Sequence, residues 1–225
     1  QGCLILGNKI VGLVHTTRMV IDRVHNAVTT MLPGVFPVHL MDETLLMDFA
    51  KIGGVNPTVR RKLLSMVRTA EKSGANTVLV TCSSLGDTVY EVQNFVDVPI
   101  LKVDEPMAEE VVKNAQNIGI IATSVSAAVG TKGLIESVAQ TKGKEINCQI
   151  FLYPESGVYL KKGLDHFNRY LAKKVFEVCP RVDALVVAQL SMCGLEDFID
   201  DNLIKEKMYT SLPYAIQKMK SMLVS

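Results

Sequence analysis

The sequence predicts an α/β fold with mostly parallel sheets. Short apolar segments alternate with helical patterns along the whole chain of 225 residues, as in folds built from β-α-β units. The helical patterns carry the start and stop residues expected of real helices. Hydrophobic residues make up 48% of the chain and charged residues 21%, so it can bury a core as one large domain or two smaller ones.

The strands are expected where short apolar runs meet turn residues. They are Ile10–Val14, Val35–Leu40, Thr77–Thr81, Ile100–Val103, Ile118–Ala122, Gln149–Tyr153 and Ala184–Ala188.

The clearest helix is expected over Asn56–Ser73, with apolar residues on one face. Asn56 is a favourable N-cap, and Gly74 follows as a C-terminal stop. A second helix is predicted from Asp104 onward. A third is predicted over Leu85–Asn94, directly after the segment VLVTCSSLGD at 78–87.

The two halves of the chain echo each other, and no linker or low-complexity stretch separates them. In each half an apolar strand ends in a turn with small polar residues and a cysteine: VLVTCSSLGD at 78–87 and ALVVAQLSMCGLED at 184–197. We predict two similar lobes, 1–97 plus 211–225 and 98–210. Ligands bind beyond the carboxyl ends of parallel strands, so we expect the site where the two turns face each other.

Composition argues against several classes of protein. Lys and Arg number 24 against 23 Asp and Glu, with no basic cluster, so a nucleic-acid partner is not expected. No apolar run approaches the ~20 residues of a membrane span, and the N-terminus does not have the pattern of a signal peptide. Five cysteines without zinc-site spacing predict reduced thiols in a cytoplasmic protein and no metal site.

Cys82 has two interpretations. It ends a buried strand, and a helix beginning directly after it would lower the pKa of the thiol and favour the reactive thiolate. Ser83 and Ser84, with nearby backbone amides, would then bind a carboxylate or phosphate. The alternative is that Cys82 is a small buried apolar residue. The other cysteines are expected in packing positions (Cys148 and Cys179) or in a terminal tail (Cys3).

Hydroxyl and imidazole groups follow two further strands. The stretch IGIIATSVSAAVGT at 118–131 places Thr123 and Ser126 at a helix N-terminus, where they suit either an anion or simple helix capping. In VGLVHTTR at 11–18, His15 and Thr16 end the first strand, and they either contact a substrate or serve the structure. His39, at another strand end, has the same two interpretations.

Five segments together resemble the aspartate/glutamate/hydantoin racemase superfamily: LVHTT, LVTCSS, DVPILKVDEPMAEE, IGIIATSVS and ALVVAQLSMCG. The resemblance extends over nearly the whole chain in the expected order. It implies two α/β lobes related by a pseudo-twofold axis, a site in the cleft between them that uses no cofactor, and a homodimer. One cysteine from each lobe would remove or return the Cα proton.

The resemblance assigns roles to residues of this sequence. Cys82 matches the first family cysteine, Ser83 and Ser84 the turn after it. Thr123 and Ser126 match positions that hold the substrate carboxylate.

The position of the second family cysteine is occupied by Gln189, and Cys193 follows four residues later. Glutamine cannot carry a proton at neutral pH. Either Cys193 reaches the site, or one thiol acts alone. His15 or Thr16, and Gln189, would also contact the substrate.

The function expected first is a cofactor-independent racemase or epimerase of an amino acid or related α-substituted carboxylic acid. A decarboxylase or a cis–trans isomerase of a dicarboxylate, each using one thiol, is the alternative within enzymes. A carboxylate-binding protein without catalysis is the alternative outside them. We expect a small carboxylate as partner and no membrane. Specificity would come from loops at 42–56 and 153–163.

Overall fold

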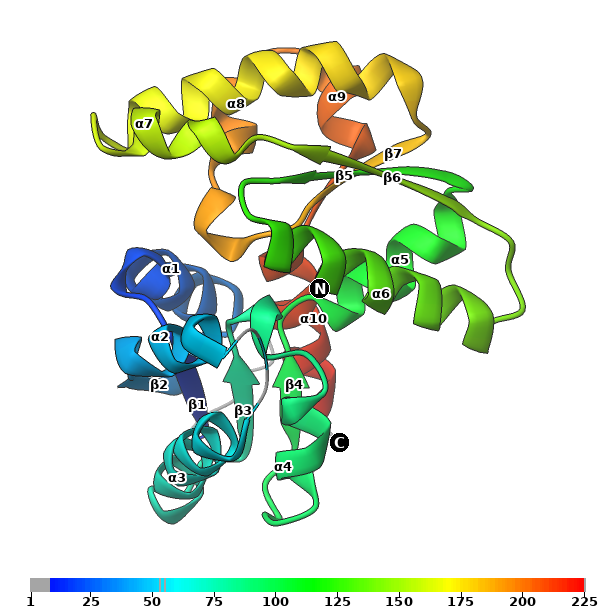
Figure 1. Cartoon of the computed structure of the whole chain (residues 1–225). Helices are drawn as coiled ribbons and strands as arrows, with labels where there is room; N and C mark the ends of the chain where they lie inside the picture. The colour runs from blue at the N-terminus through cyan, green and yellow to red at the C-terminus, as the bar shows by residue number, and fades with distance from the viewer. Residues whose placement is uncertain (1–8, 53, 55, 225) are drawn as a thin grey trace. The chain divides into compact units, whose positions relative to one another are not determined.

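The computed structural model describes residues 9–52, 54 and 56–224, and Cys3 and Gly53 lie outside them. The chain divides into two compact units. The first ends at Val103 and resumes at Leu212, and the second is Asp104–Ser211. In the described residues each unit contains one parallel sheet of four strands with helices on both faces (Figure 1). The predicted α/β class is confirmed.

The first unit is built on a sheet with the strand order β2-β1-β3-β4. Its strands are β1 (Lys9–His15), β2 (Val35–Met41), β3 (Thr77–Val80) and β4 (Ile100–Lys102). Its helices are α1 (Ile21–Met31), α2 (Glu43–Ile52), α3 (Pro57–Lys72), α4 (Thr88–Gln93) and α10 (Ser211–Val224), with short 3₁₀ helices η1 (Arg18–Val20) and η2 (Ser83–Leu85).

Side chains alternate across this sheet as the period of a strand requires. Val14, Val78 and Val80 pack with α2, α3 and α4 on one face, in a core that includes Leu63. Helix α3 lies very close to the sheet at Gly12, where an added Cβ would come within 2.7 Å of the Ala70 Cβ. Glycine permits this close approach of helix and strand.

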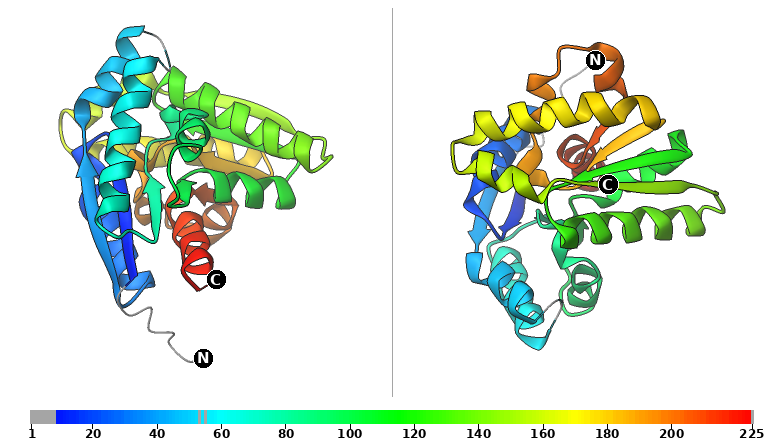
Figure 2. Two further views of the ribbon diagram at one scale, coloured as in Figure 1. Left: turned by 90° about the horizontal axis from the view of Figure 1, so that it is seen from below. Right: turned by 45° about the horizontal axis from the view of Figure 1, so that its top comes forward.

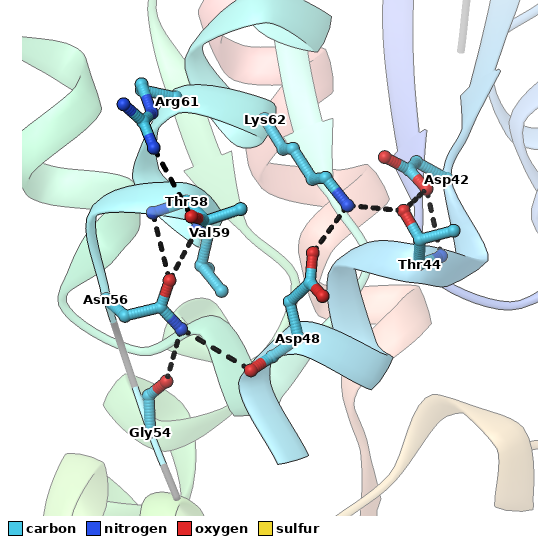
Figure 3. Close-up of polar contacts among 9 residues, drawn as sticks. All are labelled: Asp42, Thr44, Asp48, Gly54, Asn56, Thr58, Val59, Arg61 and Lys62. Atoms are coloured by element: carbon cyan, nitrogen blue, oxygen red, sulfur yellow. Dashed lines mark hydrogen bonds and ion pairs between the residues drawn. The ribbon is translucent and has the colours of Figure 1, made fainter. Parts of the chain in front are cut away.

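Hydrogen bonds and an ion pair connect α2 to α3 at the carboxyl edge of this sheet (Figure 3). Lys62 on α3 donates to the Thr44 hydroxyl and pairs with Asp48 on α2. The Asn56 side chain accepts from two amides in the first turn of α3 and donates to the Asp48 carbonyl. The predicted N-cap is thus confirmed. Asp42 begins this segment, and its amide donates to the His15 carbonyl at 3.1 Å.

The second unit repeats the arrangement with the strand order β6-β5-β7-β8. Its strands are β5 (Asn117–Ala122), β6 (Asn147–Leu152), β7 (Ala184–Val187) and β8 (Met208–Thr210). Its helices are α5 (Glu105–Asn114), α6 (Val125–Thr141), α7 (Gly157–Leu160), α8 (Leu164–Val178) and α9 (Asn202–Lys207), with 3₁₀ helices η3 (Pro154–Ser156), η4 (Cys179–Arg181), η5 (Leu190–Met192) and η6 (Leu195–Phe198).

Helix α8 covers one face of this second sheet, and α5 and α6 cover the other (Figure 2, right). Ile121, Leu185 and Val187 point to the α8 side, where they pack with Leu171. Both faces are covered, as is typical of parallel sheets.

Strand pairing makes the two units equivalent, strand by strand. Val14 pairs with Val80 in the first sheet, and Ile121 pairs with Val187 in the second. The central strands β1 and β3 therefore correspond to β5 and β7. The similarity of the two halves, weak in sequence, is explicit in strand order and register.

Several sequence predictions need correction. Residues 208–210 form an eighth strand that was not predicted, and the helix predicted over 85–94 is a 3₁₀ turn followed by the short α4. The segments 42–56 and 153–163, predicted as loops, contain α2 and the η3–α7 pair. Strand β4 pairs with β3, so the boundary placed at 97/98 moves to Val103. Within the described part of the chain, no helix is long and apolar enough to cross a membrane.

Candidate functional site

Strands β3 and β7 lie in the interior of their sheets and end in matching turns. The Thr81 amide donates to the Val14 carbonyl at 3.0 Å, and the Ala188 amide donates to the Ile121 carbonyl at the same distance. The next residues, Cys82 and Gln189, are extended and occupy the N-cap positions of η2 and η5. Cys82 and Gln189 are therefore equivalent residues of the two units.

Cys82 lies at the carboxyl end of a buried strand and is half-buried, as are Ser83 and Ser84. It packs against the core formed with α3 and α4. The helix predicted to begin directly after it is absent: η2 has three residues, Gly86 has φ 46°, and α4 begins at Thr88. An α-helix dipole therefore does not act on Cys82, contrary to the sequence prediction. The predicted position at the end of a strand is confirmed, and the structure adds that Cys82 is partly exposed.

The other described thiols are less suited to chemistry. Cys148 is half-buried on β6, and burial, with the charge of Glu136, raises the pKa of its thiol to about 11. Cys179 is buried, and burial raises its pKa as well. Cys193 is only 5% exposed and is the C-cap residue of η5, the position that Gly86 has in η2. In the repeat, Cys193 is therefore not the counterpart of Cys82.

The second unit brings Thr123 and Gln189 together. Gln189 Oε1 accepts hydrogen bonds from the Thr123 backbone amide and from its hydroxyl, each at 2.8 Å. Thr123 directly follows β5, and β5 pairs with β7, so the contact follows from the strand order. The Thr123 hydroxyl, which the resemblance assigned to a substrate carboxylate, is thus engaged with Gln189, and so is the Thr123 amide.

Helix α6 begins at the same edge with a serine cap, as the capping interpretation of this segment predicted, and the capping residue is Ser124. Ser124 is the N-cap, and its hydroxyl accepts from the Ala127 amide at 3.3 Å. Ser126 is exposed in the first turn, with its hydroxyl 3.4 Å from that of Ser124. Serine is among the preferred N-cap residues, and its place directly before the helical segment is the sequence signal of this cap.

Three histidines of the first unit form a hydrogen-bonded chain. His15 Nδ1 lies 3.0 Å from the Thr81 hydroxyl, and His15 Nε2 lies 2.9 Å from His39 Nδ1. His39 Nε2 in turn lies 3.0 Å from His25 Nδ1 on α1. The chain runs from an exposed imidazole to one without exposed surface.

The donors and acceptors along these hydrogen-bonded histidines can be assigned from Thr81 onward. The Thr81 hydroxyl donates to the Val14 carbonyl, so its oxygen accepts from His15 Nδ1–H. His15 Nε2 then accepts from His39, and His39 Nε2 accepts from His25. Burial, and then the charge of His39, lowers the pKa of His15 to about 4. Burial and His25 also lower the pKa of His39, against a smaller raising effect of Asp22.

These contacts bear on the predicted substrate-binding residues at the end of β1. Both ring nitrogens of His15 are hydrogen-bonded within the protein, which is the arrangement of a structural histidine. Thr16 is 4% exposed and corresponds to Thr123 in the repeat. The sequence did not predict that His25 joins this histidine chain, because sequence spacing does not indicate which rings meet. Among the described residues, no group of three or more His, Cys, Asp or Glu side chains, the histidine chain included, is arranged to hold a metal ion.

Several solved structures with this fold are racemases. The chain is similar to an aspartate racemase from Picrophilus torridus, at a TM-score of 0.72 and 16% identity, covering 96% of this chain and 94% of that one. It is similar to a glutamate racemase from Bacillus anthracis, at a TM-score of 0.68 and 15% identity, covering 96% and 82%. An allantoin racemase from Klebsiella pneumoniae matches at a TM-score of 0.67 and 12% identity, covering 96% and 88%.

The chain therefore has the fold of the aspartate, glutamate and hydantoin racemases, as its sequence motifs indicated. No protein-family model and no curated protein sequence matches it.

Proposed function

We propose that the protein is a cofactor-independent enzyme that moves the proton on the carbon next to a carboxylate, as in a racemase or epimerase. The observation that supports this most strongly is the half-buried thiol of Cys82 at the carboxyl end of a central parallel strand, in a racemase fold. The substrate would be an amino acid or a related α-substituted carboxylic acid.

In this proposal the Cys82 thiolate is the general base. Its sulfur takes the Cα proton, the S–H bond forms as the C–H bond breaks, and the electron pair moves into the substrate carboxylate. Hydrogen-bond donors must stabilise the charge that develops on the carboxylate oxygens. Ser83 and Ser84 would supply donors next to Cys82, in the same unit.

Gln189 favours chemistry with one thiol as a second candidate. It occupies the position equivalent to Cys82, and an amide neither gives up nor takes a proton near neutral pH. A decarboxylase or cis–trans isomerase acting through Cys82 alone needs no second base.

Cα–H exchange in D₂O tests the proposal. A panel of amino acids and α-substituted acids is incubated with the protein, and deuterium at Cα is followed by proton NMR. We expect exchange in at least one of them and its loss, by about 10²-fold or more, in Cys82→Ser. Cys179→Ser is the matched control, because that thiol is buried and its pKa is raised. Exchange that survives in Cys82→Ser would contradict the proposal.

A further inference from the structure

The Gln189 carboxamide has one fixed orientation. A backbone N–H can only donate, so the atom 2.8 Å from the Thr123 amide must be the oxygen of Gln189 and not its nitrogen. The Thr123 hydroxyl donates to the same oxygen at 2.8 Å. Because oxygen and nitrogen share one carbon, the NH₂ group is directed away from Thr123.

This NH₂ group is available to a ligand. Among the described residues, the two contacts with Thr123 are the hydrogen bonds of the Gln189 side chain, and neither uses its nitrogen. Gln189 is half-buried at the carboxyl end of β7, the edge at which parallel sheets bind ligands. A polar NH₂ in such a place is suited to an oxygen acceptor.

Thr123 cannot serve that acceptor in the same state. Its amide and hydroxyl both donate to Gln189 Oε1, so a carboxylate would have to displace the glutamine to reach them. The donor presented to a ligand is instead the amide nitrogen at the end of the longer glutamine side chain.

We propose that Gln189 binds the substrate carboxylate through its NH₂ group and that Thr123 is a positioning residue that acts by holding the glutamine oxygen. The inference rests on the proposed function and deepens it. Gln189, which has no acid–base chemistry to offer, becomes a specificity residue for a negatively charged oxygen. Hydrogen bonds to a charged acceptor are about twice as strong as those between neutral groups.

Gln189→Glu is the informative variant. A carboxylate at this position can accept the same two hydrogen bonds from Thr123, so the turn keeps its support. The atom presented to the ligand changes from an N–H donor to a charged oxygen, which repels a carboxylate. A ligand with an amide in place of that carboxylate can donate to the new oxygen.

Calorimetry with two matched pairs measures the effect: aspartate against isoasparagine and glutamate against isoglutamine, each amide differing only at the α-carboxyl. The measurements use Cys82→Ser protein, so that turnover does not interfere. We expect Gln189→Glu to raise the Kd of the acid by about tenfold or more, while the Kd of the amide changes by less than about threefold or falls.

Thr123 variants test the positioning role. Thr123→Val keeps the backbone donor and the volume but removes the hydroxyl, so the carboxamide is less firmly oriented. We expect the Kd of the acid to rise by about three- to tenfold and Thr123→Ser to restore it. Restoration by serine is a result that a mere packing role would not give.

Three results would overturn the inference: an equal loss for acid and amide in Gln189→Glu, no change for either, or no binding of any of the four ligands to the protein with Gln189. Failure of the proposed function has a different signature. Cα exchange would then persist in Cys82→Ser, while the preference for acid over amide would still depend on Gln189.

Discussion

The described thiols differ in the two properties that govern reactivity, exposure and pKa. Cys82 is half-buried, whereas Cys179 and Cys193 are buried. Cys148 is half-buried like Cys82, but its pKa of about 11 leaves little thiolate at neutral pH. Cys82 is therefore the described thiol that is partly exposed at the end of a central strand, whereas the pKa values of Cys148 and Cys179 are raised.

We predict that Cys82 is alkylated first. The protein carries Cys3→Ser, because Cys3 lies outside the described residues, and is treated at pH 7 with stoichiometric iodoacetamide. Peptide mass mapping should find the adduct mainly on Cys82. Faster labelling of Cys148 or Cys179 would remove the basis for assigning the site to Cys82.

The histidine chain makes a prediction about acid stability. His15 has a folded-state pKa of about 4 against 6.5 for an unperturbed histidine, so the unfolded chain binds more protons between these values. The free energy of unfolding should hold above pH 6.5 and decrease by roughly 1–3 kcal/mol as the pH falls to 4. Physically, a proton on His15 Nε2 would face the N–H that His39 donates to it.

Urea unfolding at a series of pH values measures this decrease. His15→Gln should flatten the profile between pH 6.5 and 4, whatever its effect on stability at pH 7. His166→Gln is the control, since His166 is an exposed histidine on α8. A profile equally steep in His15→Gln and the parent would show that other groups cause the acid destabilisation.

At the scale of elements, local sequence signals predicted the helices and strands. Asn56 and the apolar spacing after it predicted α3, because capping and helical period are properties of adjacent residues. The helix after Cys82 was mispredicted because Leu85, Val89 and Val92 have helical spacing, yet the chain turns at Gly86 between them.

Two glycines allow a matched test of packing between elements. Gly12 lies where β1 meets α3, and an added Cβ would contact the Ala70 Cβ at 2.7 Å. Gly12→Ala should lower the free energy of unfolding by about 1–3 kcal/mol. Gly133 is exposed on α6 with nothing within 4 Å of an added Cβ, so Gly133→Ala should raise it by about 0.5–1 kcal/mol. Chemical denaturation of both variants checks the opposite signs, and a stabilising Gly12→Ala would contradict the close approach.

At the scale of the whole molecule, the repeat explains which parts of the site the sequence could indicate. The strand ends and their polar turns were visible in both halves, so Cys82, Thr123 and Gln189 were all named. The contact between Thr123 and Gln189 was not, because it depends on strand order and register over 66 residues of chain. The same limit applies to the histidine chain, whose members come from two strands and a helix.

Each unit also contains a helix that follows the last strand of the other unit's sheet. Helix α5 follows β4 of the first sheet but belongs to the second unit, and α10 follows β8 of the second sheet but belongs to the first. Each unit is therefore completed by chain that leaves the other sheet. The difference between Cys82 and Gln189 is the notable departure from this symmetry.

That departure leads to a stereochemical prediction. Racemisation needs a proton donor on each face of the planar intermediate, and the repeat supplies a titrating group at only one of two equivalent positions. In D₂O we expect exchange at Cα with retention to be faster than inversion. NMR and chiral chromatography measure the two rates on the same sample.

The variants sharpen this prediction. Cys193→Ala should change inversion little, because Cys193 corresponds to Gly86 and is buried. Gln189→Cys should raise the inversion rate relative to exchange, because it places a thiol at the position equivalent to Cys82. Equal rates of exchange and inversion in the parent, both lost in Cys193→Ala, would instead identify Cys193 as a second base. The asymmetry of the repeat would then lie in geometry alone, with a thiol reaching the substrate from one helical turn further along the chain.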